Sequence, residues 1–367
     1  MLLDLIRARI HEHGPMTVAA FMDLALYHPE LGYYARAPRS VAAGDFVTSV
    51  DLGPLFGELV ATQLAEMAAL LGPAGAPFTL VEAGAGDGRL SHAMLRGLKK
   101  VAPHVCAHTH LHLVERSAAA RAAQHHVLAA WTEQAMGSEQ LPGEFEGVIV
   151  ANELLDALPV HRAVMREDGL REVYVDLEGD CLVEREGAPS TAALAAQLSS
   201  TGVALDLGAH AEVSTAAAAW VRDAAARLRR GFMILIDYGH EARALYGGAR
   251  PMGTLTTGRN RQHADGDAVA SWLDRPGEQD ITAPVDFTTV RLAAAAAGCT
   301  VLGLMDQSCF LTALAEPKVQ SFDDAERRSF ATLVAPGGLG STRKVFVLAK
   351  GMGSPVLRGC SGVMQLT

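Results

Sequence analysis

A glycine-rich turn is the part of this chain whose residue types and spacing most clearly indicate chemistry. Gly84, Gly86 and Gly88 alternate with other residues, and glycines without a Cβ let backbone N–H groups approach a ligand closely. A dinucleotide-binding turn has two residues between its second and third glycines, whereas this turn has one. Two acids, Glu82 and Glu115, end the predicted strands before and after the turn, and both would repel a phosphate. The pattern favours a nucleoside ligand without phosphates over an ordinary glycine turn with two surface acids.

The charges around the turn match a ligand with a cationic centre and a free ribose. A carboxylate at the end of the second strand can accept hydrogen bonds from both ribose hydroxyls, as in other nucleotide-binding units. S-adenosylmethionine carries a sulfonium, an α-amino group and an unphosphorylated ribose, so these residues favour it over NAD. We therefore predict that it binds Glu82, Gly84, Gly86, Gly88 and Glu115.

A second polar run follows the predicted strand 147–152. Asn152, Glu153 and Asp156 come at or directly after its end. Two carboxylates three residues apart could hold a guanidinium and leave one nitrogen lone pair free to attack. Methyl transfer from a sulfonium is an in-line displacement that depends on positioning and proton removal. For Asp156 the alternative of capping a following helix is nearly as well supported, whereas Asn152 and Glu153 indicate function.

Three further residues lie beside motifs at strand ends. His161 and His240 are predicted at the site as acceptor-binding or general-base groups. Tyr238 is either a site residue or an ordinary half-buried aromatic. The other histidines have no defined set of Cys or carboxylate partners, so no metal site is predicted.

A parallel sheet covered by helices would bring these residues together. From residue 78 short apolar runs alternate with helical stretches, and ligands of such open sheets bind outside the carboxyl ends of the strands. We expect an α/β fold. The predicted parts are an N-terminal helical segment (1–76), a core (77–350) with an insertion (about 160–230) and a lid-like loop (about 245–284), and a C-terminal tail (351–367).

Composition limits the classes of function. The 367 residues are 49% hydrophobic and 20% charged, which indicates a folded chain, and a net charge of −10 argues against nucleic-acid binding. The longest uncharged apolar stretch, 292–305, is shorter than the roughly 20 residues of a membrane-spanning helix. Five scattered cysteines and an N-terminus unlike a signal or transit peptide lead us to expect a cytoplasmic location. The sequence sets no oligomeric state.

The chain resembles the MidA-type class I S-adenosylmethionine-dependent methyltransferases, a family that includes the mitochondrial complex I assembly factor that methylates a protein arginine. Besides the glycine turn, the motifs that carry the resemblance are YHPELGYY (27–34), AGDFVTS (43–49), NELLDALPVH (152–161), IDYGHE (236–241) and PGEQDITA (276–283). Their order is more specific than the turn alone, and together they cover most of the chain.

The resemblance implies a Rossmann-like class I methyltransferase core, with Gly44, Asp45 and Phe46 and the segment 238–240 closing over the cofactor. It also implies a protein arginine as acceptor, with a respiratory-complex subunit as one such partner. Pro284 stands where the family has His, Gly258 where a Tyr is common, and Leu154 with Leu155 where two phenylalanines are usual. These departures concern the acceptor pocket more than the fold.

Two other functions compete with a protein arginine methyltransferase. A cofactor-binding but non-catalytic assembly chaperone would use the N-terminal segment to hold a partner, although it has no need of acids at the strand ends. An NAD-dependent oxidoreductase is disfavoured by the glycine spacing and by Glu82.

Overall fold

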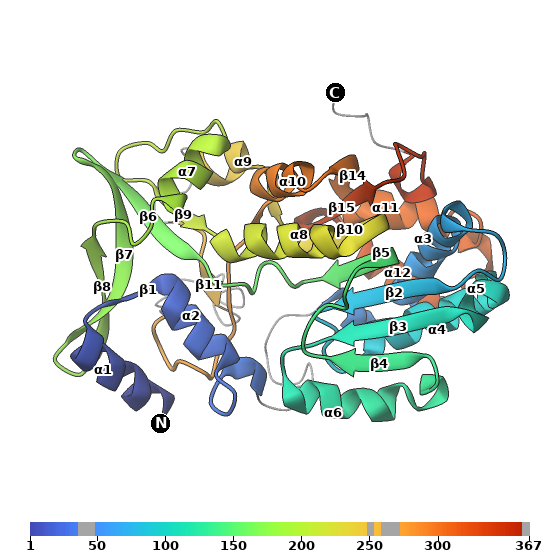
Figure 1. The fold of residues 1–367 in the computed structure, drawn as a ribbon, viewed down its shortest axis with the longest axis horizontal. Coiled ribbons are helices and arrows are strands. Elements are labelled where there is room, and N and C mark those ends of the chain that lie inside the picture. The colour runs from blue at the N-terminus through green and yellow to red at the C-terminus, as the bar shows by residue number, and fades with distance from the viewer. Residues whose placement is uncertain (36–47, 248–252, 258–271, 362–367) are drawn as a thin grey trace. The chain divides into compact units, whose positions relative to one another are not determined.

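The computed structural model (Figure 1) describes residues 1–35, 48–247, 253–257 and 272–361. The chain divides into two compact units, each built from three stretches of sequence. The accessory unit comprises Met1–Phe46, Leu155–Val221 and Gly239–Ala293, and the core unit comprises Val47–Leu154, Arg222–Tyr238 and Ala294–Thr367. The predicted N-terminal segment 1–76 is therefore shared between the two units, and the predicted insertion falls mainly in the accessory unit. Much of the predicted lid-like loop lies outside the described residues.

The core unit is built on a sheet whose seven main strands have the order β4-β3-β2-β5-β10-β15-β14. The first five of these strands are parallel, and β15 is antiparallel to both of its neighbours. Their bounds are β2 Phe78–Ala83, β3 Thr109–Val114, β4 Ala135–Ser138, β5 Phe145–Asn152, β10 Leu228–His240, β14 Cys299–Asp306 and β15 Arg343–Lys350. Figure 1 shows β2, β3 and β4 side by side.

The chain reverses its direction of winding between β2 and β5. Strands β3 and β4 lie on one side of β2, whereas β5 and β10 lie on the other. Val148 to Val150 of β5 and Phe232 to Ile234 of β10 are fully buried, as expected for parallel strands covered on both faces. This doubly wound arrangement confirms the predicted Rossmann-like α/β fold, and its switch point is where such sheets bind ligands.

The helices of the core unit pack closely because small residues meet at their contacts. A Cβ on Gly57 would lie 2.5 Å from the Cβ of Ala93, and one on Gly97 would lie 2.6 Å from that of Ala61, so α3 and α4 approach along two glycine contacts. The helices with residues in this unit are α3 Leu55–Leu71, α4 Arg89–Val101, α5 Pro103–Ala107, α6 Ala118–Val127, α8 Thr215–Arg227, α11 Gln307–Ala315, α12 Asp324–Leu333 and α13 Leu339–Thr342, with short 3-10 turns η3 Ser49–Leu52, η4 Ala129–Trp131, η5 Val319–Ser321 and η6 Arg358–Cys360.

The accessory unit contains an antiparallel sheet with the order β1-β7-β6-β9, and β8 pairs with β7. Its strands are β1 Met16–Thr17, β6 His161–Arg166, β7 Gly169–Glu178, β8 Cys181–Gly187, β9 His210–Val213, β11 Thr256–Thr257, β12 Ile281–Thr282 and β13 Val285–Asp286. Its helices are α1 Leu2–His13, α2 Val18–Tyr27, η1 Tyr33–Ala35, α7 Ala193–Ser200, α9 Ala242–Tyr246 and α10 Phe287–Ala296. In α1, Leu2, Ile6 and Ile10 recur every four residues and are buried. The last two residues of β10 pair with β13 as the eighth strand of the large sheet.

Two stretches differ from the sequence-based expectation. Alternating apolar and polar residues in 160–186 predict a hairpin of two strands, but the stretch forms three strands, because β8 adds a mostly exposed edge to β7. The tail after residue 350 is packed as far as residue 361: Leu357 is fully buried, and the Gly359 N–H donates to Oε1 of Gln63 at 2.9 Å. One buried leucine and one buried hydrogen bond leave no periodic pattern in the sequence, so the packing of this segment could not be predicted.

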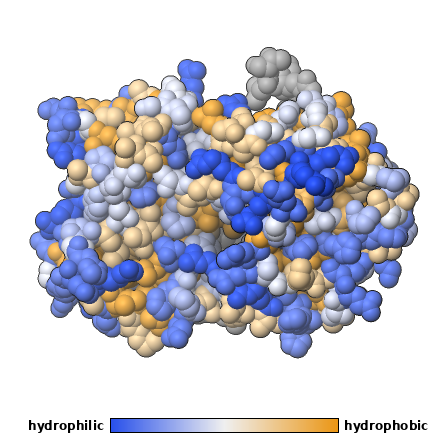
Figure 2. Space-filling model, viewed as in Figure 1, coloured by the Kyte–Doolittle hydropathy of each residue, from blue (hydrophilic) through white to orange (hydrophobic). Residues whose placement is uncertain are grey.

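Hydrophilic and hydrophobic residues are interspersed on the face shown in Figure 2. Within the described ranges, the helices are too short or too polar to cross a bilayer.

Candidate active site

The glycine turn joins the carboxyl end of β2 to the first turn of α4. Gly84, Gly86 and Gly88 have φ values of 70°, 51° and 88°, which lie in the left-handed region that glycine adopts readily. A Cβ on Gly84 would come within 3.1 Å of Cδ1 of Leu154. A Cβ on Gly86 would meet no described atom within 4 Å, so the backbone of Gly86 borders open space. The turn thus offers a ligand close access to its main chain.

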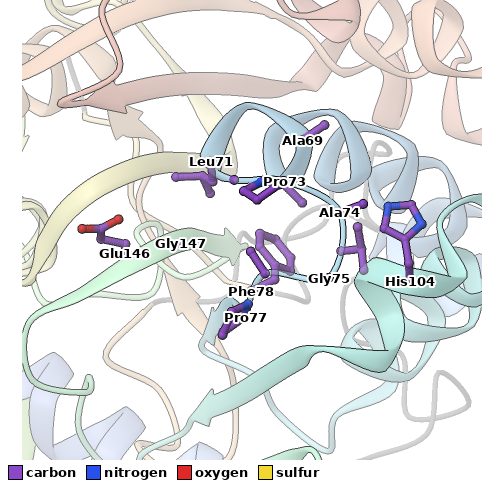
Figure 3. A pocket seen from close by; sticks show the side chains of 14 residues that line it. Ala69, Leu71, Pro73, Ala74, Gly75, Pro77, Phe78, His104, Glu146 and Gly147 are labelled. Atoms are coloured by element: carbon purple, nitrogen blue, oxygen red, sulfur yellow. The ribbon is translucent and has the colours of Figure 1, made fainter.

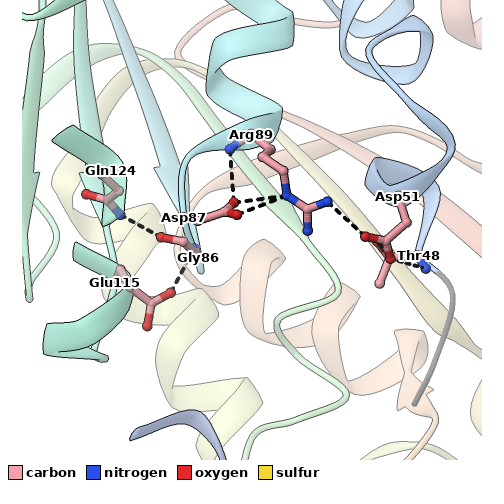
Figure 4. A network of polar contacts seen from close by, with 7 residues as sticks. All are labelled: Thr48, Asp51, Gly86, Asp87, Arg89, Glu115 and Gln124. Carbon is pink, nitrogen blue, oxygen red and sulfur yellow. Dashed lines mark hydrogen bonds and ion pairs between the residues drawn. The ribbon is translucent and has the colours of Figure 1, made fainter. Parts of the chain in front are cut away.

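Hydrogen bonds hold both backbone groups of Gly86, the central glycine of the turn (Figure 4). The Gly86 N–H donates to Oε2 of Glu115 at 2.9 Å, and Nε2 of Gln124 donates to the Gly86 carbonyl at 2.8 Å. The Ser117 N–H donates to Oε1 of Glu115 at 2.7 Å. The carboxylate predicted to bind ribose is therefore fixed beside the turn. Gln124, on α6, was missed because it lies 38 residues from its partner.

Arg89, which begins α4, ties the turn to the segment after residue 47. Its guanidinium contacts Asp87 and, at 2.9 Å, Asp51. Asp51 also accepts the Thr48 N–H and hydroxyl, each at 2.9 Å, in the manner of a capping box. The predicted motif 43–49 thereby connects to the turn through its last residues. Gly44, Asp45 and Phe46 lie outside the described residues, and their predicted role stays a prediction.

Glu82 lies beneath the turn, with 3% of its surface exposed. Its Oε2 accepts the hydroxyl of Ser91. Burial raises the pKa of Glu82 to about 8, against the opposing effect of the Ser91 hydrogen bonds, and the nearby Asp87 and Glu115 raise it further. Burial therefore favours the neutral form of Glu82 at neutral pH, and its predicted contact with the cofactor stays a prediction.

The end of β5 leaves two oxygen atoms buried and without a hydrogen-bond partner among the described residues, namely Oδ1 of Asn152 and Oε1 of Glu153. Glu153 also has a φ of 51°, a conformation that is costly for a residue with a side chain. Its N–H donates to the Ile236 carbonyl of β10 at 2.8 Å, which holds it there. Backbone strain and an oxygen without a hydrogen-bond donor therefore coincide at Glu153, the residue predicted to contact the substrate that receives the methyl group.

Arg343 is a neighbour of Glu153 that the sequence reading missed. Its guanidinium donates to Oε2 of Glu153 at 2.8 Å, and the two side chains are 4% and 12% exposed. The same guanidinium lies 5.8 Å from the centre of the Tyr238 ring, the residue opposite Arg343 in the β10–β15 register. The available signal was an arginine two residues before the apolar run 345–349.

The other predicted residues lie in the accessory unit. No helix follows Asp156, whose segment leads into β6, so the helix-capping alternative for this residue is wrong. Its carbonyl accepts the Ala283 N–H at 2.9 Å, and the residue is 9% exposed. His240 stands opposite Asp286 in the β10–β13 register.

His161 forms a dyad with Glu172, a residue that the sequence reading also missed. Nδ1 of His161 lies 2.7 Å from Oε1 of Glu172, whose side chain is fully buried. Burial pushes the pKa of Glu172 upward, but the hydrogen bonds from His161 and Ser190 outweigh it and leave that pKa lowered. The dyad fixes the imidazole by one nitrogen and leaves Nε2 as its other polar atom.

A surface pocket of the core unit lies at the opposite ends of the strands (Figure 3). Phe78 and Gly147, near the amino ends of β2 and β5, line it together with His104 and the loop 72–77. Open α/β sheets bind their ligands at the carboxyl ends. This pocket is therefore separate from the candidate site.

The core unit has the features that an S-adenosylmethionine site requires. Open space borders the Gly86 backbone, Glu115 supplies a fixed carboxylate, and two buried oxygen atoms without a described hydrogen-bond donor lie at the end of β5. The residues present thus fit the cofactor at the switch point of the sheet, and the fold and the site together define a methyltransferase of this cofactor class.

Comparisons with known proteins agree with this class. A profile of S-adenosyl-L-methionine-dependent methyltransferases matches residues 59–305, and the chain belongs to this family. The Danio rerio protein arginine methyltransferase NDUFAF7 is 30% identical over 80% of this chain and 72% of its own length, and the Caenorhabditis elegans homolog is 29% identical over 76% and 68%. The resemblance to MidA-type methyltransferases is confirmed.

Two crystal structures of Burkholderia thailandensis proteins share the whole fold. One, bound to S-adenosyl-homocysteine, has a TM-score of 0.86 at 29% identity and covers 98% of this chain and 94% of its own. The other has a TM-score of 0.83 at 30% identity, with 98% and 93% covered. The predicted cofactor, S-adenosylmethionine, is therefore confirmed.

The prediction of a cytoplasmic location is contradicted, because the matching zebrafish, nematode and fly proteins are all named as mitochondrial. The physical reason for the error is that scattered, unpaired cysteines indicate reducing surroundings and do not distinguish one such compartment from another.

Proposed function

We propose that this methyltransferase transfers the methyl group to a side-chain nitrogen of arginine in a protein. The observation that carries the proposal is the unpartnered, buried Oε1 of Glu153 at the end of β5, next to Oδ1 of Asn152. Both atoms accept hydrogen bonds and need N–H or O–H donors. A guanidinium supplies several N–H groups and a charge that complements a carboxylate. The names of the vertebrate, nematode and fly relatives support the same acceptor.

In this proposal different strand ends of the core unit bind the cofactor and the methyl acceptor. Gly84, Gly86, Gly88 and Glu115 hold the cofactor, which supplies an electrophilic methyl group when bound. Glu153 and Asn152 orient the acceptor nitrogen for in-line attack and offset its positive charge. Transfer to a guanidinium also requires that the nitrogen lose a proton.

The predicted acceptor-side roles of Asp156, His161 and His240, in the accessory unit, and of Tyr238, in the core unit, stay predictions. Glu172 holds His161 so that Nε2 is the nitrogen able to take a proton. A respiratory-complex subunit as the acceptor protein stays a prediction from the family resemblance.

The test is to incubate the purified chain with S-adenosylmethionine that carries a tritiated methyl group and with a protein extract, then to hydrolyse the proteins in acid. Label in methylarginine is expected. Label in methyllysine or methylhistidine would contradict the arginine acceptor. So would label that mild base releases as methanol before the acid hydrolysis, because such label marks a methyl ester. Binding of S-adenosylhomocysteine without any protein labelling would favour the non-catalytic chaperone.

Two variants connect that label to the site. Glu153→Gln should lower incorporation at least tenfold while the affinity for S-adenosylhomocysteine stays within a few-fold, because the acceptor and not the cofactor loses its partner. Glu178→Gln, on the exposed end of β7, is the matched control and should leave incorporation unchanged.

A further inference from the structure

Arg343 and Glu153 combine two costly features at one contact. A guanidinium with 4% of its side chain exposed has lost most of its hydration, and Glu153 holds a left-handed backbone conformation. A buried ion pair of this kind is weak evidence for stability, since apolar residues of similar size often serve as well. Its presence beside the cofactor turn therefore calls for a reason other than folding.

The geometry of the pair treats the two carboxylate oxygens differently. Oε2 accepts Arg343 at 2.8 Å, whereas Oε1 is buried and accepts no hydrogen bond from the described residues. The Glu153 N–H is fixed to Ile236, so backbone and carboxylate are each anchored once. Under these restraints Oε1 has a set position.

We propose that Arg343 is a positioning residue for methyl transfer: by holding Oε2 of Glu153 it directs Oε1 to an N–H group of the methyl acceptor. The inference rests on the proposed function for the location of the acceptor. It also predicts which groups can receive the methyl group. An N–H group can donate a hydrogen bond to Oε1, whereas a substrate carboxylate would be repelled by the negative charge of Glu153. Tyr238 contributes by covering the guanidinium face.

A neighbouring ion pair provides a matched control. Lys344, the next residue of β15, binds Oδ1 of Asp306 on β14 within the same unit. Its side chain is 19% exposed, and it makes no contact with Glu153 that the structure describes. Lys344→Met removes a cation from the same end of β15 and leaves the pair of Arg343 and Glu153 unchanged.

The experiment uses two cofactor analogues and needs no knowledge of the acceptor protein. Sinefungin carries an amine where S-adenosylmethionine carries its methyl group, so its N–H groups probe the acceptor side, whereas S-adenosylhomocysteine has no group there. Calorimetric titration should give the wild-type protein at least a tenfold preference for sinefungin, in line with a charged hydrogen bond. Arg343→Gln should abolish this preference while the affinity for S-adenosylhomocysteine stays within about threefold. Arg343→Lys should keep part of it, and Lys344→Met all of it.

A double variant separates positioning from mere proximity. Glu153→Gln should also abolish the preference, and adding Arg343→Gln to it should change nothing further, because Arg343 acts through Glu153. An undiminished preference in a folded Arg343→Gln variant would overturn the proposal. So would a parallel loss of affinity for both analogues, which is the signature of a structural role. If Arg343→Gln does not fold, Arg343→Lys decides: a reduced preference supports positioning, and a wild-type preference refutes it.

Failure of this inference differs from failure of the proposed function. Methylarginine formation with a sinefungin preference that ignores Arg343 would remove only the positioning role. Label on another amino acid, together with a preference that depends on Arg343, would remove only the arginine acceptor.

Discussion

In the accessory unit, the buried acid Glu172 has a partner on each oxygen: His161 on Oε1, and Ser190 with Tyr174 on Oε2. In the core unit, Glu153 has Arg343 on Oε2 and no described partner on Oε1. A buried carboxylate with hydrogen-bond donors on both oxygens contributes to the stability of its own unit. A buried carboxylate with a donor on only one oxygen can bind a ligand through the other. The difference assigns to Glu172 the support of its own unit and of the His161 ring, and it assigns acceptor recognition to Glu153; substitutions can test this division.

The largest expected effect concerns the glycine turn. Gly86→Val places a branched side chain in the open space beside the turn and should weaken S-adenosylhomocysteine binding at least 100-fold in calorimetric titration. Gly298→Val is the matched control, since Gly298 also has a positive φ, 81°, and no described atom within 4 Å of an added Cβ. Both variants carry a similar backbone strain. Equal affinities in the two variants would show that the turn does not border the cofactor.

The next effect tests the satisfied acid. Glu172→Gln weakens the charged hydrogen bonds to His161 and Ser190 and should lower the free energy of unfolding by about 2 kcal/mol at neutral pH. Because the folded pKa of Glu172 is lowered, its contribution is present above its ordinary pKa and is lost as the pH falls through the folded value. Urea unfolding measures the loss, with the exposed Glu178→Gln as control. A loss of cofactor affinity as large as the loss of stability would contradict the division between the units.

A third effect follows from the raised pKa of Glu82. Between the ordinary value of 4.5 and about 8, the unfolded chain has released the Glu82 proton while the folded chain keeps it. Wild-type stability therefore falls with rising pH in this window, by up to about 1.4 kcal/mol per pH unit. Glu82→Gln lacks this contribution. Urea unfolding at pH 5, 6, 7 and 8 should show the variant gaining on the wild type at each step, and parallel curves would contradict a neutral Glu82.

The smallest effect concerns a single hydroxyl of the accessory unit. The Tyr34 hydroxyl donates to Oδ1 of Asp280 at 2.9 Å, so Tyr34→Phe should cost about 1 kcal/mol in thermal or urea unfolding. Ser200→Ala removes a hydroxyl that donates to the Gln197 carbonyl at 2.7 Å at an exposed position and should cost less. The reverse order would indicate that burial does not set the value of these bonds.

The parallel strands and the glycine turn could be predicted from the sequence because their signals are local. Apolar runs bounded by polar residues identified β2, β3 and β5, and the spacing of Gly84, Gly86 and Gly88 identified the turn. The pairing of Arg343 with Glu153 could not be predicted, since 190 residues separate the two and only the strand order brings them together. Glu172 could not be predicted for another reason: in a strand with alternating apolar and polar residues, the polar residues are expected to face solvent.

The position of β15 in the sheet has a consequence for how the protein is made. The ribosome produces β15 after β14, yet β15 lies between β10 and β14 and forms backbone pairs with both. Until residues 343–350 emerge, the apolar edge of β10 beyond β5 is open and can pair with other chains. A nascent or truncated chain that ends before residue 343 should therefore be prone to aggregation and dependent on chaperones, however complete its glycine turn is.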